Sequence, residues 1–201
     1  MSELERWETR FRPPAYVFGK EPNAFLKAQA GRLRGRKAAL SVADGEGRNG
    51  VWLAEQGLDV LAVDFSATAL AKAHALAQER GVRLRTETAD ITAWRWPEAA
   101  FDVVAAIFIQ VVFPPERPAL FANLKRALKP GGLLLLQGYR TEQLTYRTGG
   151  PPEVERLYTR SILETGFGDM HDLEIREHDS VISEGTGHVG MSALIDLVGI
   201  K

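Results

Sequence analysis

The sequence predicts a single α/β domain with a doubly wound, mostly parallel seven-stranded sheet that ends in an antiparallel hairpin. From residue 37 onward, short apolar runs of strand length alternate with helical segments, and strands separated by helices form parallel βαβ crossovers. The first apolar run, 38–43, leads directly into a glycine-rich turn and a helix. Near the carboxyl end, two strand-like segments follow each other without a helix, which favours an antiparallel pair at the sheet edge.

Each element is expected from its apolar pattern and its end signals. The strands are expected at 38–43, 59–63, 82–88, 101–109 and 133–137, with the hairpin strands at 172–181 and 188–198. Helices are expected at 24–33, 49–56, 67–80, 115–128 and 153–165. Asn23 and Ser66 precede helical runs as N-caps, and Gly57 and Gly81 follow them as stops.

Composition excludes several classes of function. A chain of 201 residues forms one domain with a sizeable core, and its net charge of −1 gives no electrostatic footprint for nucleic acid or an anionic membrane. No apolar run reaches the ~20 residues of a membrane span, and the charged N-terminus is unlike a signal peptide. The chain has no cysteine, which excludes disulfides and thiolate chemistry and is compatible with a cytoplasmic protein. His171 and His178 have no second ligand at metal spacing, so we predict no metal site.

The turn GEGRNG at 45–50 predicts a nucleotide-type cofactor site. Gly45 and Gly47 allow positive φ angles and a close approach of a ligand to the backbone. The helix that follows presents unpaired N–H groups at its start. Strand, glycine turn and helix in this order place a cofactor at the carboxyl edge of a sheet. Asp64 follows Gly45 by 19 residues, the distance at which a ribose-binding carboxylate is expected.

Charge separates the two cofactors that fit this pattern. A dinucleotide would place a pyrophosphate on a turn that carries Asp44 and Glu46. Each carboxylate near a phosphate would cost about 1–4 kcal/mol, depending on the dielectric. S-adenosylmethionine has no phosphate and carries a sulfonium and an ammonium, both of which an acidic turn favours. The turn therefore predicts a methyl donor rather than a nicotinamide cofactor.

Several further motifs resemble those of class I S-adenosylmethionine-dependent methyltransferases, specifically the small bacterial group similar to tellurite-resistance methyltransferases. The general features are the glycine turn, Asp64, Asp90 after the third strand, and LKPGG at 128–132. The narrower features are YVFGKEPN at 16–23, GRN at 47–49, QLxYxTGGP at 143–151 and EGxxHxG at 184–190. The resemblance covers nearly the whole chain and implies a Rossmann-like fold.

The resemblance also implies which residues bind the donor. Asp64 would accept hydrogen bonds from the ribose hydroxyls, and Asp90 would accept one from the adenine amino group beside the backbone of Ile91. Tyr16 belongs to an aromatic segment that either covers the cofactor cleft or simply docks on the core. The expected cofactor-binding set is Tyr16, Ala43, Asp44, Gly45, Glu46, Gly47, Arg48, Asn49, Asp64, Phe65, Asp90 and Ile91.

One position departs from the usual family pattern. Alignment of the glycines places Ser41 where strand one normally carries an acid, and Ala43 at the first glycine of the turn. In the family, the missing acid receives the ammonium of the methionine part. Asp44 or Glu46 is therefore expected to compensate, and the sequence leaves the choice between them open.

The expected function is methyl transfer to a small molecule, such as an oxyanion or another soft nucleophile, with S-adenosyl-L-homocysteine as product. An anionic acceptor needs no strong base, whereas a hydroxyl or amine does, and His188, Tyr139 and Gln110 are the candidate catalytic residues.

We expect a flap and helix in 1–36, a cofactor-binding core in 37–140 and acceptor-side elements in 141–201, in a cytoplasmic monomer or dimer. A NAD-type oxidoreductase and a non-catalytic S-adenosylmethionine-binding module remain the alternatives.

Overall fold

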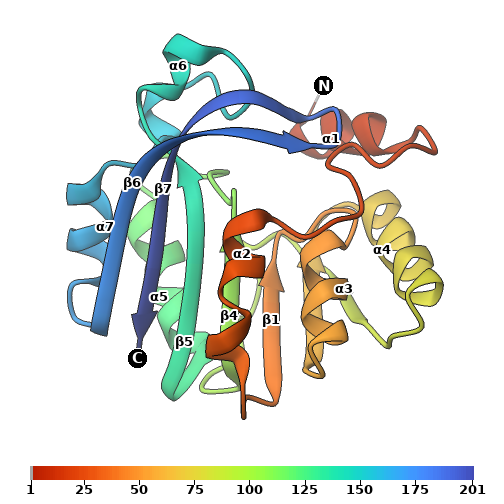
Figure 1. The fold of residues 1–201 in the computed structure, drawn as a ribbon, viewed down its shortest axis with the longest axis horizontal. Helices are drawn as coiled ribbons and strands as arrows, with labels where there is room; N and C mark the ends of the chain where they lie inside the picture. Colours follow the sequence, from red (N-terminus) through yellow and green to blue (C-terminus); the bar gives the residue numbers. More distant parts are fainter. Residues whose placement is uncertain (1) are drawn as a thin grey trace.

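The computed structural model describes residues 2–201, and within them seven strands form one mixed sheet (Figure 1). The sheet order is β3-β2-β1-β4-β5-β7-β6, and β3, β2, β1, β4 and β5 pair in parallel. β7 is antiparallel to β5, and the edge strand β6 is antiparallel to β7. This topology confirms the predicted fold class. The strands are β1 (Ala38–Val42), β2 (Asp59–Asp64), β3 (Arg85–Thr88), β4 (Phe101–Ile107), β5 (Leu128–Tyr139), β6 (His171–Glu184) and β7 (His188–Ile200).

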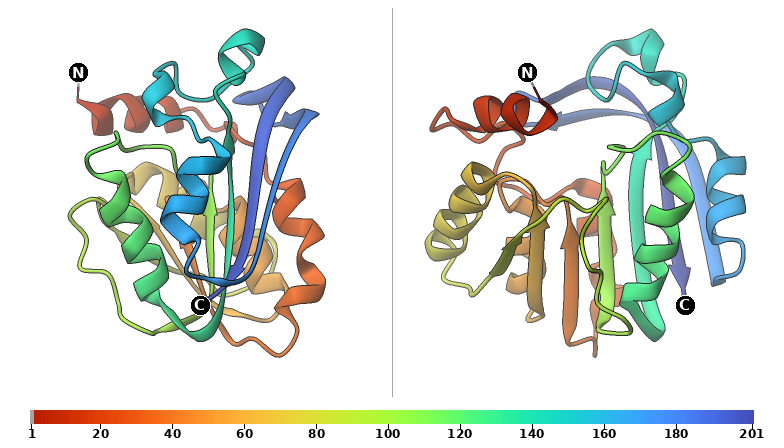
Figure 2. Two further views of the ribbon diagram at one scale, coloured as in Figure 1. Left: turned by 90° about the vertical axis from the view of Figure 1, so that its left-hand side faces the viewer. Right: turned by 180° about the vertical axis from the view of Figure 1, so that it is seen from behind.

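Helices cover both faces of the sheet, as the three views show (Figures 1 and 2). α2, α3 and α4 cover one face, and α5 and α7 cover the other. The helices are α1 (Glu3–Phe11), α2 (Ala24–Ala28), α3 (Arg48–Glu55), α4 (Ala67–Glu79), α5 (Arg117–Ala127), α6 (Gln143–Tyr146) and α7 (Arg160–Phe167), with 3-10 turns η1 (Ala30–Leu33) and η2 (Val154–Arg156). None of the helices in residues 2–201 is long and apolar enough to cross a membrane.

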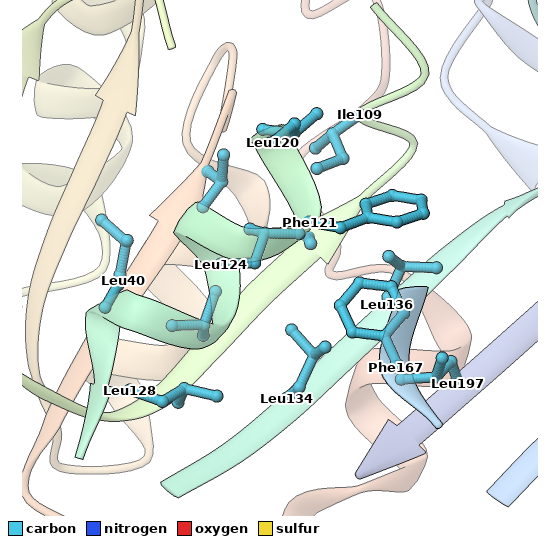
Figure 3. Packing of buried hydrophobic residues seen from close by; sticks show 14 of the residues in the cluster. Leu40, Ile109, Leu120, Phe121, Leu124, Leu128, Leu134, Leu136, Phe167 and Leu197 are labelled. Atoms are coloured by element: carbon cyan, nitrogen blue, oxygen red, sulfur yellow. The ribbon is translucent and has the colours of Figure 1, made fainter. Parts of the chain in front are cut away.

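The central strands are buried on both sides, which explains their continuous apolar runs. Figure 3 shows one side of this core, where Phe121 and Leu124 of α5 pack toward Leu134 and Leu136 of β5 and Phe167 of α7. All five side chains are at most 3% exposed. This packing buries α5 and α7 against β5, which pairs with β4 in the sheet.

The amino-terminal segment differs most from the expectation. No helix was expected before residue 24, but α1 forms there with Ser2 as its N-cap and Glu5 completing a capping box. The helix expected at 24–33 is split into α2 and η1, with Asn23 as the cap of α2. Figure 1 shows α1 lying above the carboxyl ends of the strands rather than against a sheet face.

Other boundaries differ because loops contribute more regular structure than their sequences suggest. β5 begins at Leu128, before the expected 133, because the LKPGG segment continues the strand after a register shift. The helix expected at 153–165 is replaced by η2 and by α7, which Thr159 caps. α6 forms in a segment that was expected to be a loop.

The β6–β7 hairpin reaches from the far edge of the sheet to the amino-terminal segment (Figure 1). At its tip, the N–H groups of Thr186 and Gly187 both donate to the carbonyl of Val17, at 2.8 Å each. A Cβ on Gly187 would lie 2.4 Å from the ring of Phe18, so only glycine allows this contact. The hairpin therefore brings the EGxxHxG motif to the carboxyl ends of β1 and β4.

Candidate functional site

A cavity of about 250 Å³ lies at the carboxyl ends of β1, β2 and β4, beneath α1. This is the edge at which open α/β sheets bind ligands. Nine of the predicted cofactor residues line it: Ala43, Asp44, Gly45, Arg48, Asn49, Asp64, Phe65, Asp90 and Ile91. Of the candidate catalytic residues, His188 lines the cavity.

Gly45 and Gly47 have different structural roles in the turn. Gly45 lines the cavity with φ of +59°, where an added Cβ would meet the ring of Phe11 at 3.7 Å. Gly47 has φ of +91°, and its Cβ would lie 2.5 Å from the Cβ of Ala73 on α4. Gly47 is therefore required by helix packing, whereas Gly45 leaves room on the cavity side.

Asp64 ends β2 with a buried carboxylate that faces the turn. Oδ2 accepts from the N–H of Gly45 and Oδ1 from the N–H of Ser66, both at 2.9 Å. Burial raises the pKa of Asp64, and these hydrogen bonds oppose that rise. Each oxygen keeps a further lone pair for a ligand hydroxyl, so Asp64 can hold the ribose of a nucleoside while it fixes the turn.

Asp44 is a buried carboxyl group on the cavity wall, next to the serine that replaces the strand-one acid. It accepts from Ser41 Oγ at 2.5 Å and from the N–H of Gly50 at 3.1 Å, in the first turn of α3. Burial raises its pKa to about 7, although these hydrogen bonds favour the charged form. A nearby cation, such as an ammonium group, would stabilise the charged form of this carboxyl group and lower its pKa.

Glu46 and Tyr16 lie outside the cavity lining and hold the amino-terminal segment. Glu46 Oε2 accepts from the N–H of Val17 and Oε1 from Lys72 Nζ, each at 2.7 Å. The Tyr16 hydroxyl donates to the Lys72 carbonyl at 3.0 Å. Of the two carboxylates in the turn, Asp44 therefore lines the cavity, whereas Glu46 clamps the amino-terminal segment.

Asp90, Ile91 and Phe65 lie at the β2–β3 end of the cavity. Asp90 Oδ1 accepts from the N–H and the hydroxyl of Thr92, which forms a local turn. Ile91 is 6% exposed and gives this end an apolar wall. A planar apolar base with a polar edge fits such a wall, and the other oxygen of Asp90 is available to that edge.

Arg48 and Asn49 line the cavity, yet each already has a protein partner. Arg48 donates to Glu184 Oε2 at 2.7 Å, with both side chains largely buried. Asn49 Oδ1 accepts from the N–H of Asn23 at 3.0 Å. Because the Arg48 charge is neutralised by Glu184, the turn offers no free cation to a pyrophosphate.

The three candidate catalytic residues have different environments. His188 is 8% exposed and its ring lies 4.5 Å from Phe18 and 4.6 Å from Phe108. Gln110 is bonded through its amide to the Tyr139 backbone, accepting at 2.6 Å and donating at 2.9 Å. The Tyr139 hydroxyl is buried without a hydrogen-bond partner in residues 2–201, and burial raises its pKa. Gln110 and Tyr139 lie outside the cavity lining, and their geometry is that of supporting residues.

The aromatic amino-terminal segment covers the cavity, which is one of the two roles that the sequence left open for it, although Tyr16 does not line the cavity. Trp7, Phe11 and Phe18 line it from α1 and the following loop, and Phe108 lines it from the end of β4. Trp7 and Phe11 stack with ring centroids 5.2 Å apart. Their spacing of four residues after a capping box was a helix signal, since side chains at that spacing share one helix face.

The residues present fit S-adenosylmethionine by charge and shape. A buried carboxylate with free lone pairs, an apolar slot and a second buried carboxyl match the ribose, adenine and ammonium of that molecule. Among residues 2–201, no group of three or more His, Asp or Glu side chains is arranged to hold a metal ion.

Comparisons with known proteins agree with this geometry. Residues 39–132 match the family described as a methyltransferase domain. Glycine/sarcosine N-methyltransferase of Halorhodospira halochloris is 34% identical over 141 residues, covering 67% of this chain and 48% of that protein. Phosphoethanolamine N-methyltransferase 1 of Triticum aestivum is 30% identical over 143 residues, covering 71% and 27%. The chain thus spans about half or less of the length of these curated relatives.

Solved structures share the whole fold. TehB from Haemophilus influenzae matches with a TM-score of 0.73 at 17% identity, over 98% of this chain and 66% of that one. The N-methyltransferase NodS from Bradyrhizobium japonicum, solved with S-adenosyl-L-homocysteine, matches with a TM-score of 0.69 at 12% identity, over 98% and 97%.

Together, the sheet order and the cavity define a Rossmann-like domain that binds a nucleoside cofactor at the carboxyl ends of its strands. The chain belongs to the class I methyltransferases, whose methyl donor is S-adenosylmethionine. The family predicted from the motifs is confirmed.

Proposed function

We propose that this chain transfers the methyl group of S-adenosylmethionine to a small molecule bound beside His188. The observation that carries the proposal is the arrangement of one continuous cavity, with Asp64 at its β2 end and His188 at the end formed by β4 and the hairpin tip. When bound, the donor supplies an electrophilic methyl carbon on its sulfonium.

The contribution of the protein is positioning and exclusion of water. Asp64 and Asp44 would hold the ribose and the ammonium, which fixes the donor along the cavity. Trp7, Phe11 and Phe18 cover the cavity with apolar surface, and the clamp formed by Glu46 holds the segment that carries Phe18. The apolar cover limits the access of water to the reacting atoms, and the cavity walls keep an acceptor in line with the donor.

Both alternatives fit the cavity less well than a methyltransferase does. A nicotinamide cofactor would bring a pyrophosphate to Asp44 and to an arginine already neutralised by Glu184. A non-catalytic module would need no side chain able to accept a proton at the far end of the cavity, where His188 lies. We further propose that the acceptor is a small molecule and that the protein acts in the cytoplasm, which its lack of cysteine favours.

Release of S-adenosylhomocysteine during incubation with S-adenosylmethionine and fractions of a metabolite extract tests the proposal. Turnover that depends on an extract fraction, and that is lost in Asp64→Ala, supports it. Binding of the donor without turnover in any fraction would favour the non-catalytic module.

A further inference from the structure

Glu184 connects three of the sequence motifs at the acceptor end of the cavity. Its Oε2 accepts from Arg48 at 2.7 Å, and its Oε1 accepts from Asn23 Nδ2 at 3.0 Å. His188 Nδ1 lies 3.5 Å from Oε2 of the same carboxylate. The YVFGKEPN, GRN and EGxxHxG segments therefore converge on one buried carboxylate, which donor binding by itself does not explain.

The geometry around His188 is that of an oriented base. Nδ1 is buried without a hydrogen-bond partner in residues 2–201 and faces the Glu184 carboxylate, which favours a proton on Nδ1. Nε2 makes no hydrogen bond and is not among the buried unpartnered atoms of the described chain, so it retains accessible surface on a residue that lines the cavity. The rings of Phe18, Phe108 and Tyr139 surround the imidazole and fix its plane.

The protonation states agree with this arrangement. Burial would raise the pKa of Glu184, but His188 and Arg48 outweigh it and lower the value to about 2. Burial lowers the pKa of His188, opposed by Glu184 and assisted by the charges of Arg48 and Arg10. At neutral pH the pair is thus a carboxylate beside an uncharged imidazole.

Charge at this end of the cavity is already balanced. The Arg48 cation and the Glu184 anion neutralise each other, and the remaining walls are apolar or aromatic, namely Phe18, Phe108 and Val111. The Arg10 guanidinium stacks on the ring of Phe18 at 5.1 Å but does not line the cavity. An oxyanion or an ammonium bound here would lose its hydration without gaining a counter-charge, which is costly.

We propose that the acceptor is an uncharged molecule with a weakly acidic S–H or O–H group on an apolar body, and that His188 Nε2 removes that proton. This inference rests on the proposed function. The sulfur or oxygen lone pair forms the bond to the methyl carbon as the carbon–sulfonium bond breaks, and the electron pair stays on the donor sulfur. The acceptor proton moves to Nε2, and the resulting imidazolium is stabilised by Glu184, which acts as a positioning residue.

The tautomer of His188 provides a test that needs no substrate. In ¹⁵N NMR of the full chain at neutral pH, we expect a proton on Nδ1 and a bare Nε2. Glu184→Gln should weaken this preference. Glu174→Gln is the matched control, because Glu174 is also on β6 and paired with an arginine, Arg32, but lies away from His188. A charged His188, a proton on Nε2, or an unchanged tautomer in Glu184→Gln would overturn the proposal.

Three probes then test the acceptor class. Benzyl mercaptan stays protonated at neutral pH, as thiols with a pKa of about 8.5 or more do, whereas 4-nitrothiophenol is ionised; selenite is the oxyanion. His188→Gln should lower kcat/KM for benzyl mercaptan by about 100-fold, and by a much smaller factor for 4-nitrothiophenol. Equal losses for both thiols, or turnover of selenite alone, would overturn the proposal.

Calorimetry with S-adenosylhomocysteine, read together with the methylation assays, separates this inference from the proposed function. If S-adenosylhomocysteine binds in calorimetry but neither thiol, nor phenol as the O–H probe, is methylated, the acceptor class is wrong and the donor assignment stands. If S-adenosylhomocysteine does not bind, the proposed function fails, and the NMR result still decides the orientation of His188 by Glu184.

Discussion

Ser41 Oγ donates to the Asp44 carboxylate at 2.5 Å, so the residue that replaces the strand-one acid holds a carboxyl group rooted three positions further along the chain. The usual pattern places this carboxyl group in the first strand, whereas in this chain it lies in the turn that follows. There it also accepts from the N–H of Gly50 at the start of α3, where the helix dipole favours a negative charge.

Asp44→Asn should weaken binding of S-adenosylmethionine by about 1.5–3 kcal/mol, because the buried carboxylate is the partner we assign to the donor ammonium. Glu46→Gln is the matched control in the same turn, since Glu46 is bonded to Val17 and Lys72 instead. We expect the control to keep the dissociation constant close to wild type and to lower Tm. Calorimetry on both variants checks this, and equal affinity of Asp44→Asn and wild type would remove Asp44 from the donor site.

The contribution of Asp44 to the stability of the free protein should fall as the pH rises from about 4 to 7. Burial raises the pKa of Asp44 from 3.8 to about 7 on folding, so in this window the folded protein holds a proton that the unfolded chain has released. The contribution is complete below the unfolded pKa and is lost as the pH passes the folded one. Urea unfolding of wild type and Asp44→Asn at several pH values measures the difference, which should disappear from the variant. Parallel curves for the two proteins would contradict the assignment.

Asp64→Ala should weaken nucleoside binding and also destabilise the fold. The destabilisation is expected because Asp64 also satisfies the N–H groups of Gly45 and Ser66. Each unpaired buried group costs about 1–3 kcal/mol. Asp64→Asn retains one acceptor oxygen and should unfold at a denaturant concentration between those of Asp64→Ala and wild type. An unchanged dissociation constant for S-adenosylhomocysteine in a folded Asp64→Ala variant would show that the residue only supports the turn.

Phe11→Ala should reduce stability by about 3 kcal/mol, because the ring is buried between α1 and the turn. It should also weaken donor binding, since the ring lines the cavity. Leu4→Ala on the same helix is the control, because Leu4 is 43% exposed and should change neither property. Thermal unfolding and calorimetry measure the stability and the donor affinity of both variants. If the two variants lose stability and affinity equally, the Phe11 ring has no specific role and any loss comes from the helix as a whole.

The fold class and the edge of the sheet at which the cavity lies were predictable from sequence, because they follow from the alternation of strands and helices and from the glycine turn. The roles of individual side chains were less accessible. Asp44 and Glu46 are two acids in one turn, separated by a single glycine, and only their surroundings in the fold show that Glu46 binds Val17 while Asp44 lines the cavity. Glu184 received no role from sequence, because its partners Arg48 and Asn23 lie 136 and 161 positions away along the chain.

The cavity is expected to bind a nucleoside that carries an ammonium and no phosphate, and calorimetry with S-adenosylhomocysteine and NAD distinguishes the two kinds of ligand. We expect S-adenosylhomocysteine to bind and to raise the unfolding free energy by about 2.7 kcal/mol at one hundred times its dissociation constant. NAD should give no binding heat and no shift in Tm. Binding of NAD, with no response to millimolar S-adenosylhomocysteine, would contradict the account.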